Sequence, residues 1–257
     1  MARLLPTKVT TPLHVLDNPA WSALTGPQRA QGEVAGAVAR YHPRISAFGA
    51  FADVPGPADW ADLATLVGPG SAVITTGCTG PPPDDWEVEY DGIGVQLTGE
   101  SLVDVPVPPV PDGVDVVALG ADDAADMLDL VALTRPGPFA PRTWELGGYV
   151  GVRRDGHLVA MAGERMHPVG WGEISAVATH PDHRRQGLGE HLVRVVAAGI
   201  AARGEVPMLH AAADNTNAVR LYEAMGFSVR RRTRFVAARA PGTRPADEPV
   251  LTLPPEG

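Results

Sequence analysis

The hydrophobic and polar positions in the second half of the chain repeat with two different periods. Strict alternation, which is typical of a half-buried β-strand, marks six segments. Repeats of three and four residues, which are typical of an amphipathic α-helix, mark three more. The predicted strands are residues 114–119, 147–153, 157–166, 172–179, 208–212 and 227–238. The predicted helices are residues 121–133, 186–203 and 215–225. Because strands and helices follow one another repeatedly, we expect a mixed α/β sheet in this half.

The first half shows the same two periods in shorter segments. Trp60, Leu63 and Val67 share one face of a helix that is predicted at residues 57–67. The other predicted helices are residues 17–24 and 27–34, and the predicted strands are residues 36–41, 46–51, 71–76 and 86–97. This half contains no recognisable spacing of catalytic or ligand-binding residues. We therefore expect a smaller α/β domain without chemistry of its own.

Proline and glycine divide the chain into parts. The 26 prolines and 29 glycines are clustered rather than spread evenly. Residues 105–113 contain several prolines that supply no N–H donors for a sheet, so they predict a domain boundary near residue 112. We expect one domain at residues 1–112, a second at residues 113–239, and a loosely held Pro-rich tail at residues 240–257.

Composition and charge exclude several classes of function. The net charge of −9 opposes the binding of polyanions that basic domains show, so we expect no nucleic-acid partner. No apolar run approaches the about 18 residues of a membrane span, and Pro6 and Pro12 interrupt the segment that a signal peptide would need. Cys78 is the sole cysteine, so no intrachain disulfide forms. These features favour a cytoplasmic protein without membrane contact.

The strongest chemical signal lies in residues 176–189, AVATHPDHRRQGLG, which run from a predicted strand through a turn into the longest predicted helix. Gly187 and Gly189 lack side chains where a ligand would approach the backbone. The first amides of a helix have no partner within the helix, and the helix dipole is positive there. With Arg184 and Arg185 they favour a diphosphate, although such a motif alone is also compatible with an ordinary turn.

Three short strings occur in a fixed order. They are Val177-Ala178-Thr179-His180-Pro181, Arg184-x-x-Gly187-x-Gly189, and Asn215-x-x-Ala218-x-x-Leu221-Tyr222-Glu223-x-x-Gly226-Phe227. Together they resemble the GNAT superfamily of acetyl-CoA-dependent N-acetyltransferases, and within it the FR47-like group related to glycine N-acyltransferase. The resemblance covers residues 114–239. Many members have glycine directly after the motif arginine, where this chain has Arg185, whose backbone N–H is still available.

The resemblance implies an acetyl-CoA site and direct transfer of the acetyl group to a primary amine, without a covalent enzyme intermediate. The diphosphate would lie on the amides of residues 185–189. The pantetheine arm would pair with strand 172–179 where strand 208–212 splays away from it, and a backbone N–H near Val177 would polarise the thioester carbonyl. The implied cofactor-binding residues are Val177, Ala178, Thr179, Arg184, Arg185, Gln186, Gly187, Leu188, Gly189, Asn215 and Tyr222.

The implied reaction needs two proton transfers. Tyr222 occupies the place of the family's general acid, and a phenol with a pKa near 10 carries a proton at pH 7. The alternative for Tyr222 is packing of its helix against the sheet. Glu173 occupies the place of the glutamate base in the family's histone-modifying branch, on the same strand face as Val177. A solvated carboxylate at Glu173 and a water relay are the alternatives, and Asn215 is expected to cap its helix.

The acceptor side is less defined. The family places substrate contacts in the loop that contains Phe139 and Trp144, so both are candidate pocket walls. His210, beside the expected splay, is a candidate substrate contact or second base, and packing within the strand is its alternative. The only other clustered candidates are His180, His183 and His191. No carboxylate or cysteine completes a metal-binding set with them, so we expect no metal.

Residues 1–112 are compatible with a degenerate second copy of the GNAT fold. Such a copy would complete the acceptor pocket or form a dimer contact. The acceptor stays open among a small amine, an amino acid, an antibiotic and a protein N-terminus. The acyl-chain preference also stays open, as does the oligomeric state, for which a homodimer is one option. The rival function is an acyl-CoA-binding sensor that keeps the cofactor site without turnover.

Overall fold

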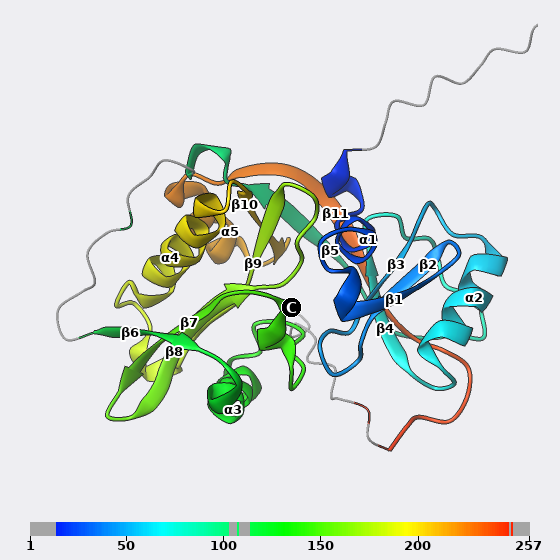
Figure 1. Ribbon diagram of the computed structural model, residues 1–257, viewed down its shortest axis with the longest axis horizontal. Helices are drawn as coiled ribbons and strands as arrows, with labels where there is room; N and C mark the ends of the chain where they lie inside the picture. Colours follow the sequence, from blue (N-terminus) through cyan, green and yellow to red (C-terminus); the bar gives the residue numbers. More distant parts are fainter. Residues whose placement is uncertain (1–13, 103–106, 108–113, 247, 249–257) are drawn as a thin grey trace, which may run out of the picture.

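The computed structural model describes residues 14–102, 107, 114–246 and 248 (Figure 1). The strands of this part form one mixed sheet of 11 strands. Helices cover both of its faces, so the expected mixed α/β class is confirmed. Within the described ranges, no helix is both long enough and apolar enough to cross a bilayer.

The strands are β1 (Gly32–Ala35), β2 (Val38–Tyr41), β3 (Phe48–Phe51), β4 (Ala72–Thr76), β5 (Glu87–Thr98), β6 (Asp115–Leu119), β7 (Tyr149–Arg154), β8 (His157–Glu164), β9 (Trp171–Thr179), β10 (Val206–Ala212) and β11 (Ser228–Arg239). The α-helices are α1 (Pro19–Thr25), α2 (Pro57–Val67), α3 (Ala124–Thr134), α4 (Leu188–Ala202) and α5 (Thr216–Met225). Six short 3₁₀ turns complete the described part: η1 (Val15–Asp17), η2 (Arg29–Gln31), η3 (Glu100–Leu102), η4 (Ala121–Asp123), η5 (Thr143–Leu146) and η6 (Pro181–His183).

The order of the strands is nearly symmetric about the centre of the sheet. It runs β1-β2-β3-β4-β11-β5-β10-β9-β8-β7-β6. In the first half, α2 connects the parallel strands β3 and β4, just as α4 connects the parallel strands β9 and β10 in the second half. The antiparallel strands β5 and β11 meet at the centre. This symmetry supports the prediction that the first half is a degenerate copy of the second.

The two halves exchange one strand each. β5 belongs to the first half but lies between β10 and β11, and β11 belongs to the second half but lies between β4 and β5. The boundary predicted near residue 112 lies outside the described residues. The division into domains stays a prediction about the chain, and in the described part the halves share a continuous sheet (Figure 1).

One predicted helix is wrong. Residues 27–34 were expected to be helical, but the structure has only the short turn η2 followed by β1. Gly36, with a φ of 59°, forms the tight connection from β1 to β2, so the polar and apolar residues of β1 alternate across a hairpin. The remaining predicted elements are present with shifts of a few residues at their ends.

The tail expected at residues 240–257 is described only at residues 240–246 and 248. The Glu248 carboxylate accepts a hydrogen bond from the backbone N–H of Ala72 at 2.6 Å and contacts Arg239 at 2.7 Å. The start of this segment is therefore attached to the edge of the first half. The other residues of the expected tail lie outside the described part.

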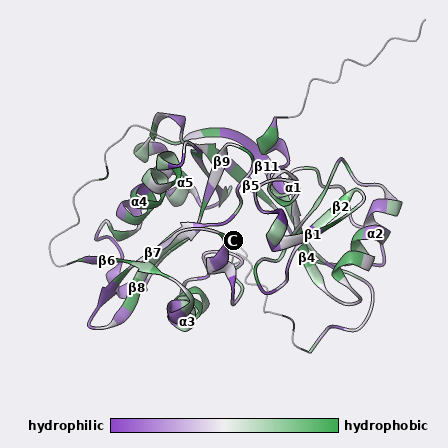
Figure 2. Cartoon of the chain, viewed as in Figure 1, coloured by the Kyte–Doolittle hydropathy of each residue, from purple (hydrophilic) through white to green (hydrophobic). Residues whose placement is uncertain are grey.

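Separate apolar clusters fill the two halves. In the second half, α4 and α5 cover one face of the sheet and α3 covers the other. In the first half, α1 and α2 pack against opposite faces of β2, β3 and β4. Figure 2 shows mostly apolar residues along β2 and β4, which lie between these two layers. Burial of these surfaces supplies the main stabilising free energy of each half.

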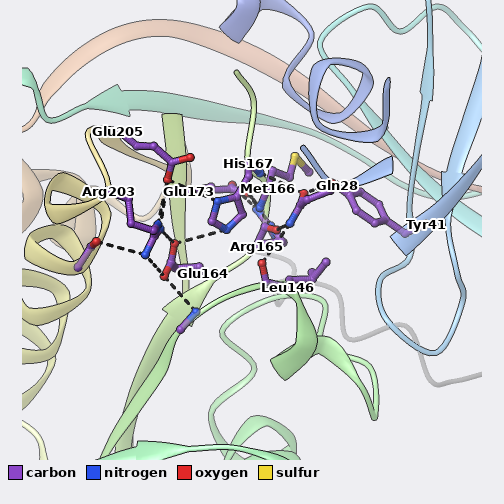
Figure 3. Close-up of polar contacts among 12 residues, drawn as sticks. Gln28, Tyr41, Leu146, Glu164, Arg165, Met166, His167, Glu173, Arg203 and Glu205 are labelled. Carbon is purple, nitrogen blue, oxygen red and sulfur yellow. Dashed lines mark hydrogen bonds and ion pairs between the residues drawn. The ribbon is translucent and has the colours of Figure 1, made fainter. Parts of the chain in front are cut away.

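Gln28 links the two halves through a fully used side-chain amide. Its nitrogen donates to the backbone oxygens of Leu146 (3.2 Å) and Arg165 (2.7 Å). Its oxygen accepts from the hydroxyl of Tyr41 (2.6 Å) and the backbone N–H of His167 (3.1 Å). Gln28 is 3% exposed, so water does not replace these bonds (Figure 3).

Replacement of Gln28 by alanine would leave four buried polar groups without their partner. We expect Q28A to lower the free energy of unfolding by about 3 kcal/mol, because unpaired buried polar groups are costly. Urea unfolding of the whole chain measures this change. Q31A is the matched control, since the side-chain oxygen of Gln31 has no hydrogen-bond partner among the described residues. An equal loss in both variants would contradict the assignment of Gln28 as the link.

Candidate active site

The parallel strands β9 and β10 separate part of the way along their length. They pair at four positions, from Trp171 opposite Val206 to Ile174 opposite Leu209. Beyond this point β9 stays paired to β8, and β10 stays paired to β5 as far as Ala212. The expected splay is therefore present, and it leaves backbone groups of both strands free to bind an extended ligand.

A β-bulge lies on β9 just after the splay begins. Ala176 and Val177 face the single residue Ala162 of β8, and Ala176 has a φ of 52°. A left-handed conformation is uncommon for a residue other than glycine, and such strain is concentrated at functional sites. A bulge also changes the direction of the following backbone groups. The sequence carries no glycine that would have marked this position.

The turn between β9 and α4 forms an anion cradle. Arg185 and Gly187 have left-handed φ values of 61° and 74°, an arrangement that gathers backbone N–H groups into a concave site. Gly187 is the N-cap of α4 and supplies no side-chain acceptor. The first bond of the helix runs from the N–H of His191 to the oxygen of Gly187, at 3.0 Å. The amides of residues 188–190 therefore have no partner within the helix.

Side chains leave this cradle accessible. Arg184, Arg185 and Gln186 are exposed, and the Arg184 guanidinium hydrogen-bonds the backbone oxygen of Thr179 at 3.3 Å. A Cβ at position 189 would lie 3.5 Å from the Thr179 hydroxyl and 3.8 Å from the Val177 side chain. Glycine at this position keeps the space between the helix and β9 free for a ligand chain.

The opposite side of the splay carries small apolar residues and Tyr222. Ala218 and Val219 of α5 pack with Val177 of β9 in one cluster. Asn215 caps α5 as expected, because its side-chain oxygen accepts from the N–H of Ala218 at 3.1 Å. Tyr222 is 9% exposed, and burial raises the pKa of its phenol to about 12. The phenol therefore holds its proton at neutral pH.

Glu173 lies at the closed end of the splay and is completely buried. Its carboxylate contacts the Arg165 guanidinium at 2.6 and 2.9 Å, the Nδ1 of His210 at 2.7 Å and the N–H of Met166 at 3.3 Å. Burial alone would raise the pKa of Glu173, but the charge and hydrogen bonds of Arg165, aided by His210, hold it well below its ordinary value. The alternative of a solvated carboxylate is excluded. The role of base stays a prediction, and this environment disfavours direct proton transfer to the carboxylate.

The expected acceptor residues occupy three different settings. Phe139 is 5% exposed, packs edge-to-face on Tyr149 and lines a cavity of about 460 Å³ whose other walls come mainly from the first half. Trp144 is half-buried in η5 and packs against the apolar cluster beneath α3. His210 lies beside Glu173 at the closed end of the splay. Phe139 and Trp144 stay predictions as pocket walls.

Two further polar residues belong to this site, and the sequence gave no sign of them. Arg165 follows β8 and reaches Glu173, while Gln96 of β5 contacts the ring of His210 at 3.1 Å. Neither belongs to a recognisable motif. Among the described residues, no group of three or more histidine, cysteine, aspartate or glutamate side chains is arranged to hold a metal.

Comparisons with known proteins agree with this geometry. The FR47-like protein family matches residues 149–236. A mycothiol acetyltransferase from Streptomyces avermitilis is 30% identical over 143 residues, which cover 49% of this chain and 46% of that protein. One from Streptomyces coelicolor is 30% identical over 148 residues, which cover 51% of this chain and 47% of that protein. The chain thus spans about half the length of these relatives.

Solved structures extend the similarity to most of the chain. A protein from Kribbella flavida, described as a GCN5-related N-acetyltransferase, has a TM-score of 0.55 and 19% identity over 89% of this chain and 96% of its own, which indicates a shared fold. A crystal structure of a GNAT-family protein from Novosphingobium aromaticivorans has a TM-score of 0.77 and 38% identity, and the match covers 90% of this chain and 100% of that one. The splay, the bulge and the cradle thus occur in a chain that belongs to the GNAT family of acetyltransferases.

Proposed function

We propose that the protein transfers an acetyl group from acetyl-CoA to a primary amine by direct attack. The observation that carries this proposal is the combination of the splay between β9 and β10 with the unpaired amides at the start of α4. These two features provide an extended backbone edge and an anion site next to each other. Acetyl-CoA has a matching shape, since a diphosphate is joined to a long amide-containing arm.

The residues of the cradle fit the donor molecule. The amides of residues 185–189 and the side chain of Arg184 would hold the diphosphate. Val177 and Thr179 would pair with the pantetheine arm along the free edge of β9, with Ala178 between them. The donor supplies an acetyl thioester, which an amine can attack. The N–H of Val177, in the bulge, would polarise its carbonyl.

Tyr222 is proposed as the general acid. Its place beside the splay allows it to protonate the leaving thiolate, and the raised pKa ensures that the proton is present. Glu173 is proposed as the carboxylate that assists removal of the amine proton, because it lies at the closed end of the same splay. The sole cysteine, Cys78, lies in the first half, so no acyl-cysteine step is proposed.

The acceptor is proposed only at the level of a primary amine. Two relatives are named mycothiol acetyltransferases, which supports acetyl transfer as the reaction class. The similarity covers about half of those proteins, so their acceptor is not carried over. The cavity lined by Phe139 and by residues of the first half supports the proposal that this half completes the acceptor pocket.

Replacement of Tyr222 by phenylalanine tests the acid. We expect kcat to fall about a hundredfold with little change in the KM for acetyl-CoA, because the ring still packs but has no proton to give. Release of free CoA with a panel of amines measures turnover. Y149F is the matched control: it removes a buried phenol hydroxyl that lies outside the splay and has no partner, and should leave kcat unchanged. Binding of CoA by calorimetry without release of thiol for any amine would show a sensor instead.

Replacement of Gly187 by alanine tests the cradle. The variant should bind CoA about tenfold more weakly, a loss of ~1.4 kcal/mol, because a methyl group enters the concave set of amides. G204A is the matched control. Gly204 has a similar φ of 78° against 74°, and an added Cβ meets no atom within 4 Å at either position. Both variants should lose about 1 kcal/mol of stability from backbone strain. Equal CoA affinities in the two variants would contradict the cradle.

A further inference from the structure

A row of hydrogen-bonded side chains crosses the sheet at the closed end of the splay. It takes one residue from each of four adjacent strands and ends just beyond a fifth. The row consists of Arg230 on β11, Gln96 on β5, His210 on β10, Glu173 on β9 and Arg165 directly after β8. The distances along the row are 2.8, 3.1, 2.7 and 2.6 Å. The first half supplies Gln96, and the second half supplies the others.

The partners of Gln96 fix the orientation of its amide. Its oxygen accepts from the Arg230 guanidinium, which can only donate. Its nitrogen donates to the backbone oxygen of Leu16 at 2.9 Å, which can only accept. The nitrogen therefore also faces the Nε2 of His210 as a donor.

This orientation in turn fixes the tautomer of His210. Because Nε2 receives a hydrogen bond from Gln96, it carries a lone pair and no proton. The ring proton lies on Nδ1 and is donated to the Glu173 carboxylate. A neutral imidazole that is held in this way at Nδ1 by a carboxylate has the arrangement of a general base acting at Nε2.

We infer that His210 is the catalytic base, that Glu173 is a positioning residue that acts through His210, and that Gln96 of the first half positions the same ring. This inference rests on the proposed acetyl transfer. It replaces direct proton transfer to Glu173 with transfer to the neighbouring imidazole. It also gives the first half a part in the reaction.

The proton transfer balances at named atoms. One N–H bond of the acceptor ammonium breaks and an N–H bond forms at the Nε2 of His210, so the acceptor becomes a neutral amine and the ring becomes an imidazolium. The Glu173 carboxylate stabilises that positive charge through the Nδ1–H. The Gln96 N–H then faces another donor and gives up its contact, while its bond to Leu16 remains. The imidazolium returns its proton to solvent before the next cycle.

The placement of the pair fits this role. His210 directly follows Leu209, the last residue of β10 that pairs with β9, so its ring lies where the splay opens. Its side chain is 4% exposed, whereas that of Glu173 is 0% exposed and its oxygens are engaged by Arg165, Met166 and His210. The imidazole nitrogen is therefore the more accessible proton acceptor of the two.

The charged and titratable groups around the ring come from several elements. Glu173 and Arg165 lie on one side of it, and Arg230 with its partner Asp17 lies on the other. Tyr41 and Tyr149 are fully buried near the Arg165–Glu173 pair, and burial raises the pKa of both phenols so that they stay neutral. Phe235 contributes an apolar contact with its ring centre 5.4 Å from that of His210. His210 and the acceptor are thus the groups here that exchange a proton at neutral pH.

The tautomer can be tested without any activity. Nitrogen-15 NMR of histidine-labelled full-length protein should show His210 with a protonated Nδ1 and an unprotonated Nε2 near neutral pH. H210N identifies the signal by its loss. A ring protonated at Nε2 alone would overturn the inference even if the protein proves to be an acetyltransferase. This measurement separates a failure of the inference from a failure of the proposed function.

The pH profile of kcat/KM separates a catalytic role from a structural one. H210N should lower kcat about a hundredfold and remove the acidic limb, with the KM for acetyl-CoA little changed. E173Q keeps an acceptor for the Nδ1–H but loses the negative charge, so the acidic limb should move to lower pH by about one unit. Q96E places a carboxylate at Nε2, which favours the imidazolium, so the limb should move to higher pH by about one unit.

E164Q is the matched control for these variants. Glu164 is another buried carboxylate in the same region, 2% exposed and paired with Arg203, but it has no contact with His210 (Figure 3). It should lose stability without a shift of the acidic limb. Shifts of E173Q and Q96E in the same direction, or an unchanged profile in H210N, would overturn the inference. Thermal unfolding of each variant shows that the compared proteins are folded.

Discussion

The open shape of the active site depends on β5, the strand that the first half inserts beside β10. A parallel strand that leaves its neighbour loses the hydrogen bonds on that edge, and an isolated strand is not stable in water. β10 leaves β9 after Leu209, yet β5 holds its other edge through Ala212 opposite Gly94. The splay can therefore stay open without a ligand to support it. A first half that merely packed against the second would not give this support, because the support comes from backbone pairing.

The near symmetry of the sheet raises the question of why only one half carries a cradle. In the first half, α2 takes the place of α4, and its start is already capped: the Asp59 carboxylate accepts from the N–H of Gly56 at 2.8 Å. Pro57 removes one donor, and Asp53 and Asp59 bring negative charge to the place where a diphosphate would lie. In the second half the N-cap is Gly187, which offers no side chain, and arginines precede it. The same backbone arrangement thus has opposite electrostatics in the two halves.

Local sequence signals predicted the elements and the cradle, but long-range pairing lay beyond them. Gly187, Asn215 and Tyr222 occur in segments whose spacing specifies a turn or a helix start, so their placement followed from neighbouring residues. The alternation in β5 predicts a strand and cannot say which strands flank it. Gln96 lies 114 residues from His210 along the chain, and only the exchange of β5 and β11 brings them together. The left-handed Ala176 was equally hidden, because no glycine marks it.

The buried row from Arg230 to Arg165 is not explained by stability alone. Removal of two charges from water costs free energy that an ion pair such as Arg165 with Glu173 only partly recovers, and apolar residues of similar volume are often as stable in such places. The row does, however, determine which nitrogen of His210 carries a proton, and it does so with residues of both halves. Strand exchange and proton chemistry are therefore linked through one set of hydrogen bonds. β5 holds β10 in place through its backbone and fixes the ring at the start of the splay through its Gln96 side chain.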